Sequence, residues 1–578
     1  MTTLSLNRDG SFPKPDRGSA GGRILAFAEG GHGRAAFLLV LICLVCFLPG
    51  FVSLHPIDRD EPRYAQATKQ MLETRDFVDI RFQEEARHKK PVGIYWMQSA
   101  AVSAADALGL EAARTTIAAY RAPSLLGAIA ATLLTYWAAL ALARRREAFL
   151  AAAFMGASVI LMVEARLAKT DAVLLATCVA AMGGLARAWL ARGAARLPSS
   201  TFLLFWIGIG VGVLVKGPMI LLFVGLAAAA LSLHERSVRW LGALRPLWGI
   251  ALALAIAAPW FVMIALRSGA DFFAASAGQD LLGKVGTAQT YHWAPPGFYL
   301  VAFFATFWPG ALMAAIGIEF AWLNRRVRET AFLLAWVVPA WVALELVPTK
   351  LPHYTMPLYP ALAIAAALGI GHGFVGPYRA RFKLFGWLMA LVPVALLIGL
   401  PIGAYMLGDR LGWPALAALA VAAAIGLSAW RLWAKARVED AALAGIASAM
   451  ALAVAVFGLA QRDLVSLKLS PNLAAAAERA LACEEPRLGT LGYREPSLVF
   501  LGGTDLAMLD GPQDAAAFLA EGGCRAVFVT DAFEVGFGQA LAEAGVAATQ
   551  AERVIGFNIN GGDPLGIGVY VRAGEGTR

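Results

Sequence analysis

Residues 384–406 read LFGWLMALVPVALLIGLPIGAYM, a run of 23 residues without a charged side chain. An α-helix of about 20 apolar residues crosses the hydrocarbon core of a bilayer, which is about 30 Å thick. Twelve further apolar runs lie along the chain, beginning near residues 36, 118, 148, 171, 202, 218, 247, 298, 331, 356, 413 and 441. The sequence therefore predicts a polytopic α-helical membrane protein with about 13 transmembrane helices.

The composition agrees with this prediction. Of the 578 residues, 59% are hydrophobic and only 15% are charged, whereas about 25% are charged in a typical soluble domain. These values exclude a soluble enzyme, a disordered chain and a disulfide-rich secreted domain as descriptions of the whole chain. The net charge is +9. In a membrane protein we interpret this charge as basic cytoplasmic loops and contacts with anionic membrane lipids, and expect no nucleic-acid partner.

The distribution of Lys and Arg in the short connections predicts the orientation. Seventeen of these residues lie in the six connections on one side, and about seven in the five short connections on the other. We therefore expect a cytoplasmic N-terminal tail over residues 1–35 and a first span that is retained. Because thirteen spans is an odd number, the C-terminal region is expected to be periplasmic, in a multi-pass protein of the bacterial inner membrane.

The distribution of apolar runs divides the chain after its N-terminal tail into a membrane domain, its long connection and a C-terminal domain. A transmembrane catalytic domain is expected over residues 36–461, interrupted by one long periplasmic connection, residues 53–117. Within that connection, residues 61–73 and 92–107 have helical spacing, which predicts short helices along the membrane surface. Beyond residue 461 short apolar strands alternate with helical stretches, so residues 462–578 are expected to form a small periplasmic α/β domain.

The five cysteines fall into two groups. Cys43, Cys46 and Cys178 lie in apolar runs and are expected to be packing residues. Cys483 and Cys524 belong to the C-terminal domain. In an oxidising compartment they either form a disulfide or remain two unpaired buried thiols, and both interpretations stay open, since a sequence does not give the distance between them.

The first candidate site follows the first span, where residues 58–64 read DRDEPRY. Charges at this place either form a solvated, salt-bridged loop or serve a function. Asp60 and Glu61 lie at a predicted helix start, where the helix dipole stabilises an anion. Unpaired charge beside hydrocarbon is costly and usually functional. The pattern therefore favours a functional role.

Four other polar clusters fall on the same predicted side: RHKKP at 87–91, EARLAKTD at 164–171, KGP at 216–218 and KLPHY at 350–354. Singly, these lysines are explained by snorkelling, and Asp171 by helix capping. Together they indicate one outward-facing cavity with carboxylates and at least four lysines. Carboxylates suit a general base or stabilisation of a positive sugar centre, and lysines suit a phosphate leaving group. The set favours glycosyl transfer from a lipid phosphate.

No cofactor is required by the sequence. A Gly-rich nucleotide-binding loop is absent from it, which disfavours chemistry driven by ATP or a nucleotide sugar. His353 and the neighbouring carboxylates could hold a divalent cation, but no ligand spacing demands one.

The motifs Asp60-Glu61-x-Arg63-Tyr64, Lys90-Pro91 with Tyr95-Trp96, Lys169-Thr170-Asp171 and Lys216-Gly217-Pro218 resemble those of the bacterial aminoarabinose transferase family, ArnT. That family is related to the protein O-mannosyltransferases within the GT-C glycosyltransferases. The resemblance covers the membrane region in order and includes an outer C-terminal domain. The sequence departs from the pattern at Lys89, where family members often carry an acidic residue before Lys-Pro.

The resemblance implies an inverting transfer of a sugar, aminoarabinose in ArnT, from undecaprenyl or another polyprenyl phosphate to a lipid A phosphate on the periplasmic side. It implies that Asp60 is the principal catalytic carboxylate, that Asp171 is a second acidic residue at the cavity, and that Glu61 supports them. The residues expected to bind the donor phosphate are Arg63, Tyr64, Lys90, Lys216, Lys350 and Tyr354.

Two alternatives remain. The same fold could transfer sugar to protein hydroxyls or to another polysaccharide. A flippase for a lipid-linked sugar is less favoured, because transporters commonly show internal repeats and broken helices at the midplane. Here no convincing repeat is present in the sequence, and the polar clusters lie at the outer boundary. Residues 493–497 (YREPS) and 556–562 (GFNINGG) are also distinctive. Turn formation explains Asn and Gly there, and no mechanism is assigned to them.

Overall fold

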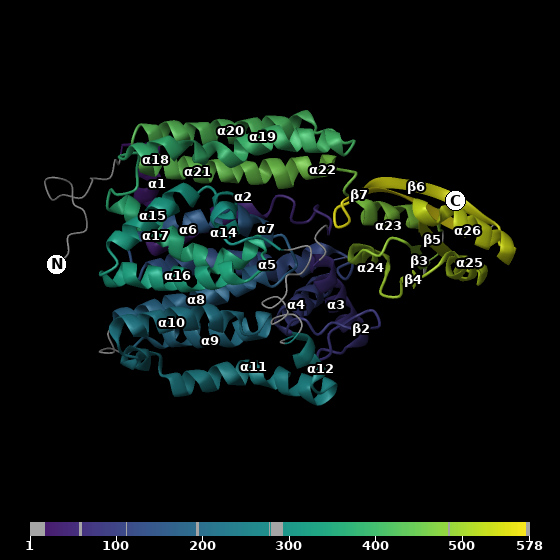
Figure 1. Ribbon diagram of the computed structural model, residues 1–578, viewed down its shortest axis with the longest axis horizontal. Helices are drawn as coiled ribbons and strands as arrows, with labels where there is room; N and C mark the ends of the chain where they lie inside the picture. Colours follow the sequence, from purple (N-terminus) through teal and green to yellow (C-terminus); the bar gives the residue numbers. More distant parts are fainter. Residues whose placement is uncertain are drawn as a thin grey trace.

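The structure is a computed structural model. It describes residues 18–56, 60–110, 112–191, 196–276, 278, 293–481, 483 and 486–573. In Figure 1 the long helices run side by side to form a bundle, and a smaller domain that contains the sheet lies beyond one end of it.

Nine helical segments among the described residues are long and apolar enough to cross a bilayer. They are α5 (Ile117–Ala139), α8 (Asp171–Leu190), α9 (Ser199–Lys216), α11 (Pro246–Ser268), α16 (Arg328–Leu346), η3 with α17 (Pro352–Leu358, Tyr359–Gly371), α18 with η4 and α19 (Ala380–Leu384, Phe385–Trp387, Leu388–Met406), α20 (Trp413–Ala434), and α21 with η5 and α22 (Val438–Ala453, Val454–Ala460, Gln461–Asp463). Three shorter apolar helices accompany them: α2 (His32–Phe47), α10 (Met219–Glu235) and α15 (Ala311–Leu323). The predicted multi-pass helical protein is confirmed.

Two of the thirteen predicted runs are broken helices. The run near residue 148 forms α6 (Arg145–Gly156) and α7 (Val159–Glu164), and the run near residue 298 forms α14 (Phe298–Thr306) and α15. The two breaks meet, because the backbone N–H of Val159 donates to the carbonyl oxygen of Trp308 at 3.1 Å. This bond satisfies a donor that the interrupted helix leaves unpaired. Helix α7 ends at Glu164, whose carboxylate belongs to the polar cluster described below.

The long connection after α2 contains the two helices that its spacing predicts, α3 (Asp60–Thr74) and α4 (Gly93–Ala107). Between them lies a small antiparallel pair, β1 (Arg81–Phe82) and β2 (Glu85–Ala86). The described part of the membrane half also contains three short helices: α1 (Ala20–Glu29), η1 (Arg239–Leu244) and α12 (Asp271–Phe273). Helix α1 falls within the segment predicted as a tail, and its Gly21 N–H donates to Asp440 at 3.0 Å.

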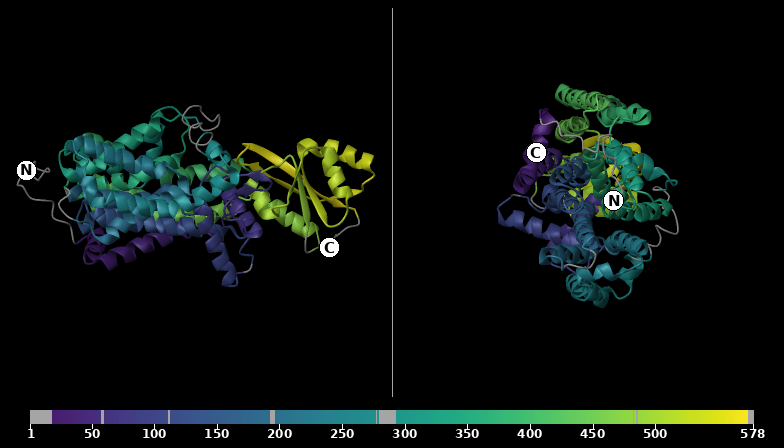
Figure 2. Two further views of the ribbon diagram at one scale, coloured as in Figure 1. Left: turned by 90° about the horizontal axis from the view of Figure 1, so that it is seen from below. Right: turned by 90° about the vertical axis from the view of Figure 1, so that its left-hand side faces the viewer.

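The C-terminal domain has a five-stranded sheet in the order β4-β3-β5-β7-β6. Strand β3 is parallel to β4 and β5, whereas β7 is antiparallel to β5 and β6. Figure 2 shows helices packed against this sheet. The elements in chain order are α23 (Leu469–Ala480), β3 (Arg487–Leu491), α24 (Pro496–Gly502), β4 (Ala507–Leu509), α25 (Pro512–Ala520), β5 (Arg525–Thr530), α26 (Asp531–Ala544), β6 (Ala548–Asn558) and β7 (Asp563–Arg572).

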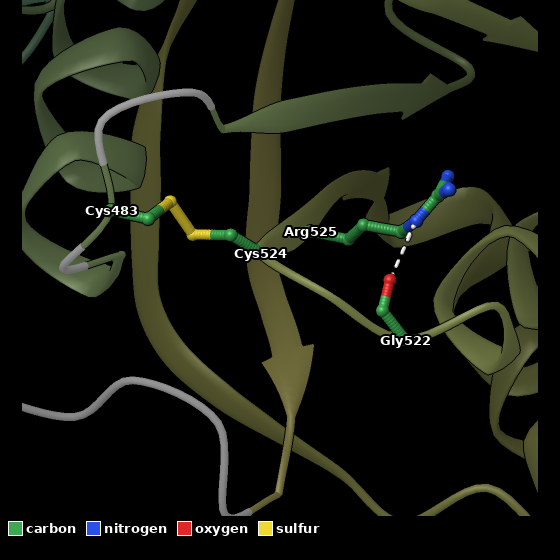
Figure 3. Close-up of a disulfide and its surroundings, with 4 residues drawn as sticks. All are labelled: Cys483, Gly522, Cys524 and Arg525. Carbon is green, nitrogen blue, oxygen red and sulfur yellow. Dashed lines mark hydrogen bonds between the residues drawn. A yellow bond between two sulfur atoms is a disulfide. The ribbon is translucent and has the colours of Figure 1, made fainter.

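The two cysteines of this domain form a disulfide, which decides between the alternatives left open by the sequence. Cys483 lies just beyond α23 and Cys524 directly before β5, with their Cα atoms 6.4 Å apart (Figure 3). The bond ties α23 to the central strand of the sheet. Cys43, Cys46 and Cys178 are buried and free, as expected for packing residues.

The C-terminal domain docks onto α3, the helix that begins at Asp60. Phe500 of α24 is buried in one cluster with Ala65 of α3 and Tyr120 of α5. Polar bonds border this contact: Lys69 Nζ donates to the carbonyl oxygen of Phe500 at 3.3 Å. Gln66 Nε2 donates to Thr504 Oγ1 at 2.7 Å. Helix α3 is therefore held between the membrane bundle and the C-terminal domain.

Candidate active site

Asp171 and Lys216 form a largely buried ion pair at the centre of the candidate site. Asp171 is the first residue of α8 and Lys216 the last residue of α9. Because these two helices are consecutive and packed together, their opposite termini meet at one end of the bundle. The Lys216 Nζ also lies 5.6 Å from the ring centre of Tyr354, a cation–π distance.

His353 extends this pair to a second carboxylate. Its Nε2 lies 3.7 Å from Asp171 Oδ1, and its Nδ1 lies 3.7 Å from Glu164 Oε1. Lys169 Nζ lies 3.4 Å from the same Glu164 oxygen. Two carboxylates, two ammonium groups and an imidazole thus form one continuous, mostly buried cluster. Opposite charges at these distances stabilise one another.

Asp60 lies near this cluster, although it belongs to a different element. It is the first residue of α3 and is exposed. Its charge interacts electrostatically with His353 on η3 and with Arg87 in the long connection. The three elements therefore bring Asp60 within electrostatic range of the Asp171 cluster.

Tyr64, one turn after Asp60, is buried beside Tyr95 and Arg87. Its ring centre lies 5.4 Å from that of Tyr95 and 4.9 Å from the Arg87 guanidinium. Burial, with smaller contributions from Tyr95 and the carboxylates of Asp60 and Asp171, raises the pKa of Tyr64 well above its ordinary value. Tyr64 therefore keeps its proton at neutral pH and serves as a hydrogen-bond donor.

Glu61 has a different environment from its neighbour Asp60. Its buried carboxylate accepts hydrogen bonds from Arg121 Nε at 2.7 Å and Arg121 Nη2 at 2.9 Å. It also accepts the backbone N–H of Ala168 at 2.9 Å. Arg121 in turn donates to the carbonyl oxygens of Phe51 at 3.0 Å and Leu54 at 2.6 Å. Glu61 thus joins α3, α5 and the segment before α8.

Arg121 is the functional neighbour that sequence reasoning missed. An arginine inside an apolar run needs a buried partner. Arg121 is the fifth residue of the apolar helix α5 (Ile117–Ala139), so its position in the sequence already indicated a buried ion pair. The identity of the partner was not available, because Glu61 lies 60 residues away.

The remaining predicted donor-binding residues lie on three segments. Lys90 precedes α4, whose first residue, Gly93, approaches α9 so closely that a Cβ there would lie 2.7 Å from the carbonyl group of Leu214. This contact brings Lys90 near the end of α9 that carries Lys216. Lys350 is buried, and its Nζ donates to the carbonyl oxygen of Val347 at 2.6 Å. Arg63 is half-buried on α3.

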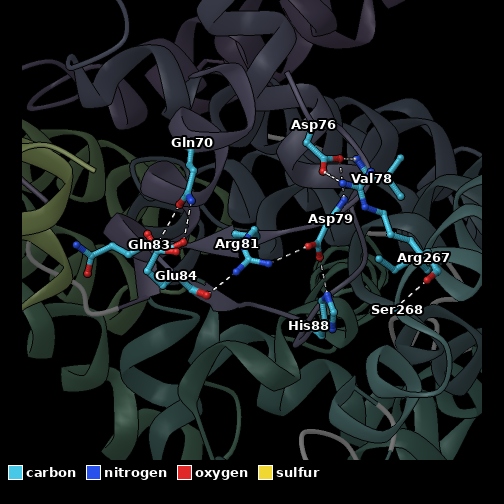
Figure 4. Close-up of polar contacts among 11 residues, drawn as sticks. Gln70, Asp76, Val78, Asp79, Arg81, Gln83, Glu84, His88, Arg267 and Ser268 are labelled. Atoms are coloured by element: carbon cyan, nitrogen blue, oxygen red, sulfur yellow. Dashed lines mark hydrogen bonds and ion pairs between the residues drawn. The ribbon is translucent and has the colours of Figure 1, made fainter. Parts of the chain in front are cut away.

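The long connection is braced by its own ion pairs (Figure 4). Asp79 accepts from His88 Nε2 at 2.8 Å and pairs with Arg81 at 3.3 Å. Asp76 pairs with Arg267 of α11 at 2.6 Å. The next residue before His88, Arg87, has its guanidinium over the Tyr64 ring.

The described part of the chain contains no group of three or more His, Cys, Asp or Glu side chains arranged to hold a metal ion. His353 contacts only two carboxylates at ion-pair distance, and lysines occupy the neighbouring positions.

Comparison with known proteins places the chain in context. Residues 35–272 match the family model described as dolichyl-phosphate-mannose-protein mannosyltransferase. The chain is 28% identical over 368 residues to the undecaprenyl phosphate-α-4-amino-4-deoxy-L-arabinose arabinosyl transferase of Aeromonas hydrophila, covering 61% of this chain and 64% of that protein. It is 29% identical over 326 residues to the protein of that name from Pseudomonas aeruginosa, covering 55% and 56%. The matched regions thus span less than two thirds of these relatives.

Two solved structures share the fold. The apo structure of ArnT from Cupriavidus metallidurans aligns with a TM-score of 0.68 at 18% identity, covering 92% of this chain and 97% of that one. The structure of the same protein bound to undecaprenyl phosphate aligns with a TM-score of 0.66 at 20% identity, with the same coverage. These comparisons confirm the fold predicted from the apolar runs. They also confirm the resemblance to the ArnT-like and protein O-mannosyltransferase-related GT-C glycosyltransferases.

Proposed function

We propose that this chain is an inverting glycosyltransferase that moves an aminoarabinose-like sugar from undecaprenyl phosphate, or another polyprenyl phosphate, to lipid A or a related envelope glycolipid. The observation that carries the proposal is the cluster of Asp171, Lys216, Glu164, Lys169 and His353 beside Asp60. It combines carboxylates with ammonium groups at the ends of apolar helices. The names of the relatives, and the undecaprenyl phosphate bound to a protein of the same fold, support the donor.

The donor phosphate is proposed to bind at the cationic side of the cluster. It replaces Asp171 as the partner of Lys216, and Lys90 and Arg63 approach it from the long connection. The protonated Tyr64 and the hydroxyl of Tyr354 donate hydrogen bonds to its oxygens. The polyprenyl chain lies among the apolar helices, which contact it much as lipid tails do.

In the chemical step, the bond between the sugar C1 and the oxygen of the polyprenyl phosphate breaks, and the phosphate leaves with both bonding electrons. An oxygen of the acceptor phosphate attacks C1 from the opposite face, so the configuration inverts. Asp60 stabilises the positive charge that develops at C1. Lys216 and Lys90 stabilise the negative charge on the leaving phosphate. A phosphate acceptor is already anionic and needs no general base.

The proposed cellular setting is the inner membrane, with the N-terminus cytoplasmic and the C-terminal domain periplasmic. The Lys and Arg bias of the connections supports this orientation, and the disulfide suits an oxidising compartment.

The test is mass spectrometry of lipid A from a strain that lacks the gene, together with transfer by purified protein in detergent. We expect the strain to lose a sugar on a lipid A phosphate. The purified protein should form the same glycosidic bond from a polyprenyl-phosphate donor. Unchanged lipid A would contradict the acceptor, and binding of the donor without any new glycosidic bond would contradict a transferase and favour a flippase.

A second candidate is transfer to protein hydroxyls, favoured by the match of residues 35–272 to a model named for protein mannosyltransferases. In that reaction the acceptor hydroxyl loses its proton to Asp60, which acts as a general base. Glycoproteomic comparison of the deletion and parent strains separates the two candidates, since only this one predicts proteins that lose a hexose or pentose.

A further inference from the structure

Residues 165–170 connect α7 to α8 without forming a helix or a strand. Both flanking helices end in the candidate active site, because α7 ends at Glu164 and α8 begins at Asp171. Lys169 lies near the end of the connection and belongs to the same site, since its Nζ lies 3.4 Å from Glu164 Oε1. A segment outside a helix lacks the regular ladder of backbone hydrogen bonds, so other groups fix its course.

Side chains from three helices bind the backbone of Ala168 and Lys169. The Ala168 N–H donates to Glu61 Oε1 of α3 at 2.9 Å. The Ala168 carbonyl oxygen accepts from Gln98 Nε2 of α4 at 3.1 Å. The Lys169 carbonyl oxygen accepts from Ser124 Oγ of α5 at 3.1 Å. All three of these side chains are fully buried, and together they fix the place from which the Lys169 side chain extends.

Gln98 uses both polar atoms of its amide group. Because the Ala168 carbonyl oxygen only accepts, Nε2 faces it, and Oε1 accepts from the Thr68 hydroxyl of α3 at 2.6 Å. Burial of an amide costs free energy unless it is hydrogen-bonded, and Gln98 has no exposed surface. The hydrogen bond to the connection is what distinguishes glutamine at this position from an apolar residue of similar length.

Ser124 reaches the connection because α5 approaches the start of α8 closely. One turn after Ser124, a Cβ atom on Gly127 would lie 3.0 Å from the Val173 nitrogen of α8. A larger residue at this position would require a shift of one helix. The close contact leaves the Ser124 hydroxyl beside the Lys169 carbonyl group, two residues before Asp171.

The Lys169 ammonium lies among the charges of the site. Lys169 and Lys216 both interact electrostatically with Asp171 and with His353. In the proposed reaction the donor is a phosphodiester, and its phosphate leaves as a monoester with a second ionisable oxygen. A positive charge that is already in place where negative charge develops stabilises that step. A second ammonium beside Lys216 is therefore suited to the leaving phosphate.

We propose that Gln98 and Ser124 are positioning residues of this site, which hold the backbone of residues 168 and 169 so that the Lys169 ammonium stabilises the leaving phosphate together with Lys216. The inference rests on the proposed function, because the leaving phosphate belongs to that reaction. Neither Gln98 nor Ser124 contacts the substrate, and both act through Lys169.

The test is a double-mutant cycle on the binding of undecaprenyl phosphate to the full-length protein in detergent. Lys169→Ala should weaken binding about 10- to 100-fold, because it removes a charge-assisted bond. Gln98→Met keeps the length of the side chain but removes the N–H donor, and Ser124→Ala removes only the hydroxyl. Each should weaken binding about 3- to 10-fold. In protein that already carries Lys169→Ala, neither substitution should weaken binding further, because residues that act through one another are not additive.

Thr135→Val is the matched control. Thr135 also lies on α5 and is fully buried, and its hydroxyl donates to the Ala131 carbonyl oxygen of its own helix at 2.7 Å. At a rise of about 1.5 Å per residue it lies about 16 Å along the helix from Ser124. Its substitution removes a buried hydroxyl far from the connection and should leave the affinity for undecaprenyl phosphate unchanged.

Melting temperatures are measured for every variant, and binding is compared well below the lowest of them. Equal weakening by Gln98→Met and Ser124→Ala with and without Lys169 would overturn the inference, because it would indicate general damage. Wild-type affinity in both variants would also overturn it, and sugar transfer by the same protein would leave the proposed function standing. The expected cycle in a protein that transfers no sugar would retain the positioning of Lys169 and refute the transferase. No binding of undecaprenyl phosphate by wild-type protein would contradict both.

Discussion

Asp60 and Glu61 are adjacent carboxylates, but they differ in exposure and in their hydrogen bonds. Asp60 is exposed, whereas Glu61 is fully buried against Arg121 and the backbone of Ala168. An exposed carboxylate can be reached by a substrate. A charge already satisfied by three hydrogen bonds holds the structure together. The two residues should therefore fail in different ways when they are neutralised.

We expect Asp60→Asn to lower the rate of sugar transfer by at least about 100-fold, because an amide neither stabilises a positive centre nor accepts a proton. Its melting temperature should be close to wild type. Glu61→Gln should instead destabilise the fold by about 3–5 kcal/mol, since it leaves Arg121 buried without a counter-charge. Transfer assays and thermal melts in detergent measure both effects. Near-normal transfer by Asp60→Asn would refute its catalytic assignment.

Lys216 is the residue for which donor binding is predicted most directly. Replacing it by alanine removes a charge-assisted bond worth about 1.5–3 kcal/mol, so the donor KM should rise about 10- to 100-fold while the acceptor KM changes little. Lys435→Ala is the control, because Lys435 is exposed after α20. An equal rise in both KM values for Lys216→Ala would indicate general damage to the cavity.

At the scale of elements, close helix contacts and helix breaks position the site. The Gly93 contact brings α4 onto α9, and α7, which a break separates from α6, ends at Glu164. The polar cluster therefore depends on irregularities in helices whose apolar composition alone would make them continuous.

Gly93→Val tests this dependence. A Cβ at Gly93 would lie 2.7 Å from the Leu214 carbonyl group, so α4 must move away, at a cost of about 1–3 kcal/mol for overpacking. Because Lys90 moves with α4, donor affinity should fall together with stability. Gly225→Val in α10 is the matched control, since no atom lies within 4 Å of that position. Binding of undecaprenyl phosphate and thermal melts are the measurements; equal behaviour of the two variants would contradict the prediction.

At the scale of the whole molecule, the C-terminal domain is part of the site's framework. It contacts α3 through Phe500 and Thr504, and the disulfide fixes the layer of helix and sheet behind that contact. If the domain becomes less rigid, the position of the start of α3 should therefore become less well fixed, although the described residues that contact Asp171 lie outside the domain.

The double substitution of Cys483 and Cys524 by serine should lower the stability of this domain by about 2–4 kcal/mol, because the bond spans 41 residues and restricts the unfolded chain. Limited proteolysis with and without reductant measures the change. Wild-type protein should shift in a nonreducing gel on reduction, and the serine variant should not. Identical proteolysis of the two proteins under oxidising conditions would contradict a stabilising role.

The sequence by itself determined the membrane architecture, because a run of apolar residues long enough to cross hydrocarbon is a local property with one stable solution. It also made Asp60, Asp171 and Lys216 candidates for the site, since charge at the ends of such runs is conspicuous. Only the tertiary structure decided which charges meet. Glu164, Asp171, Lys216 and His353 come from four helical elements, and the pairing of Glu61 with Arg121 and the bonds from Gln98 and Ser124 to residues 168 and 169 likewise join distant segments. Such contacts depend on how helices pack and where they break, which no local pattern encodes.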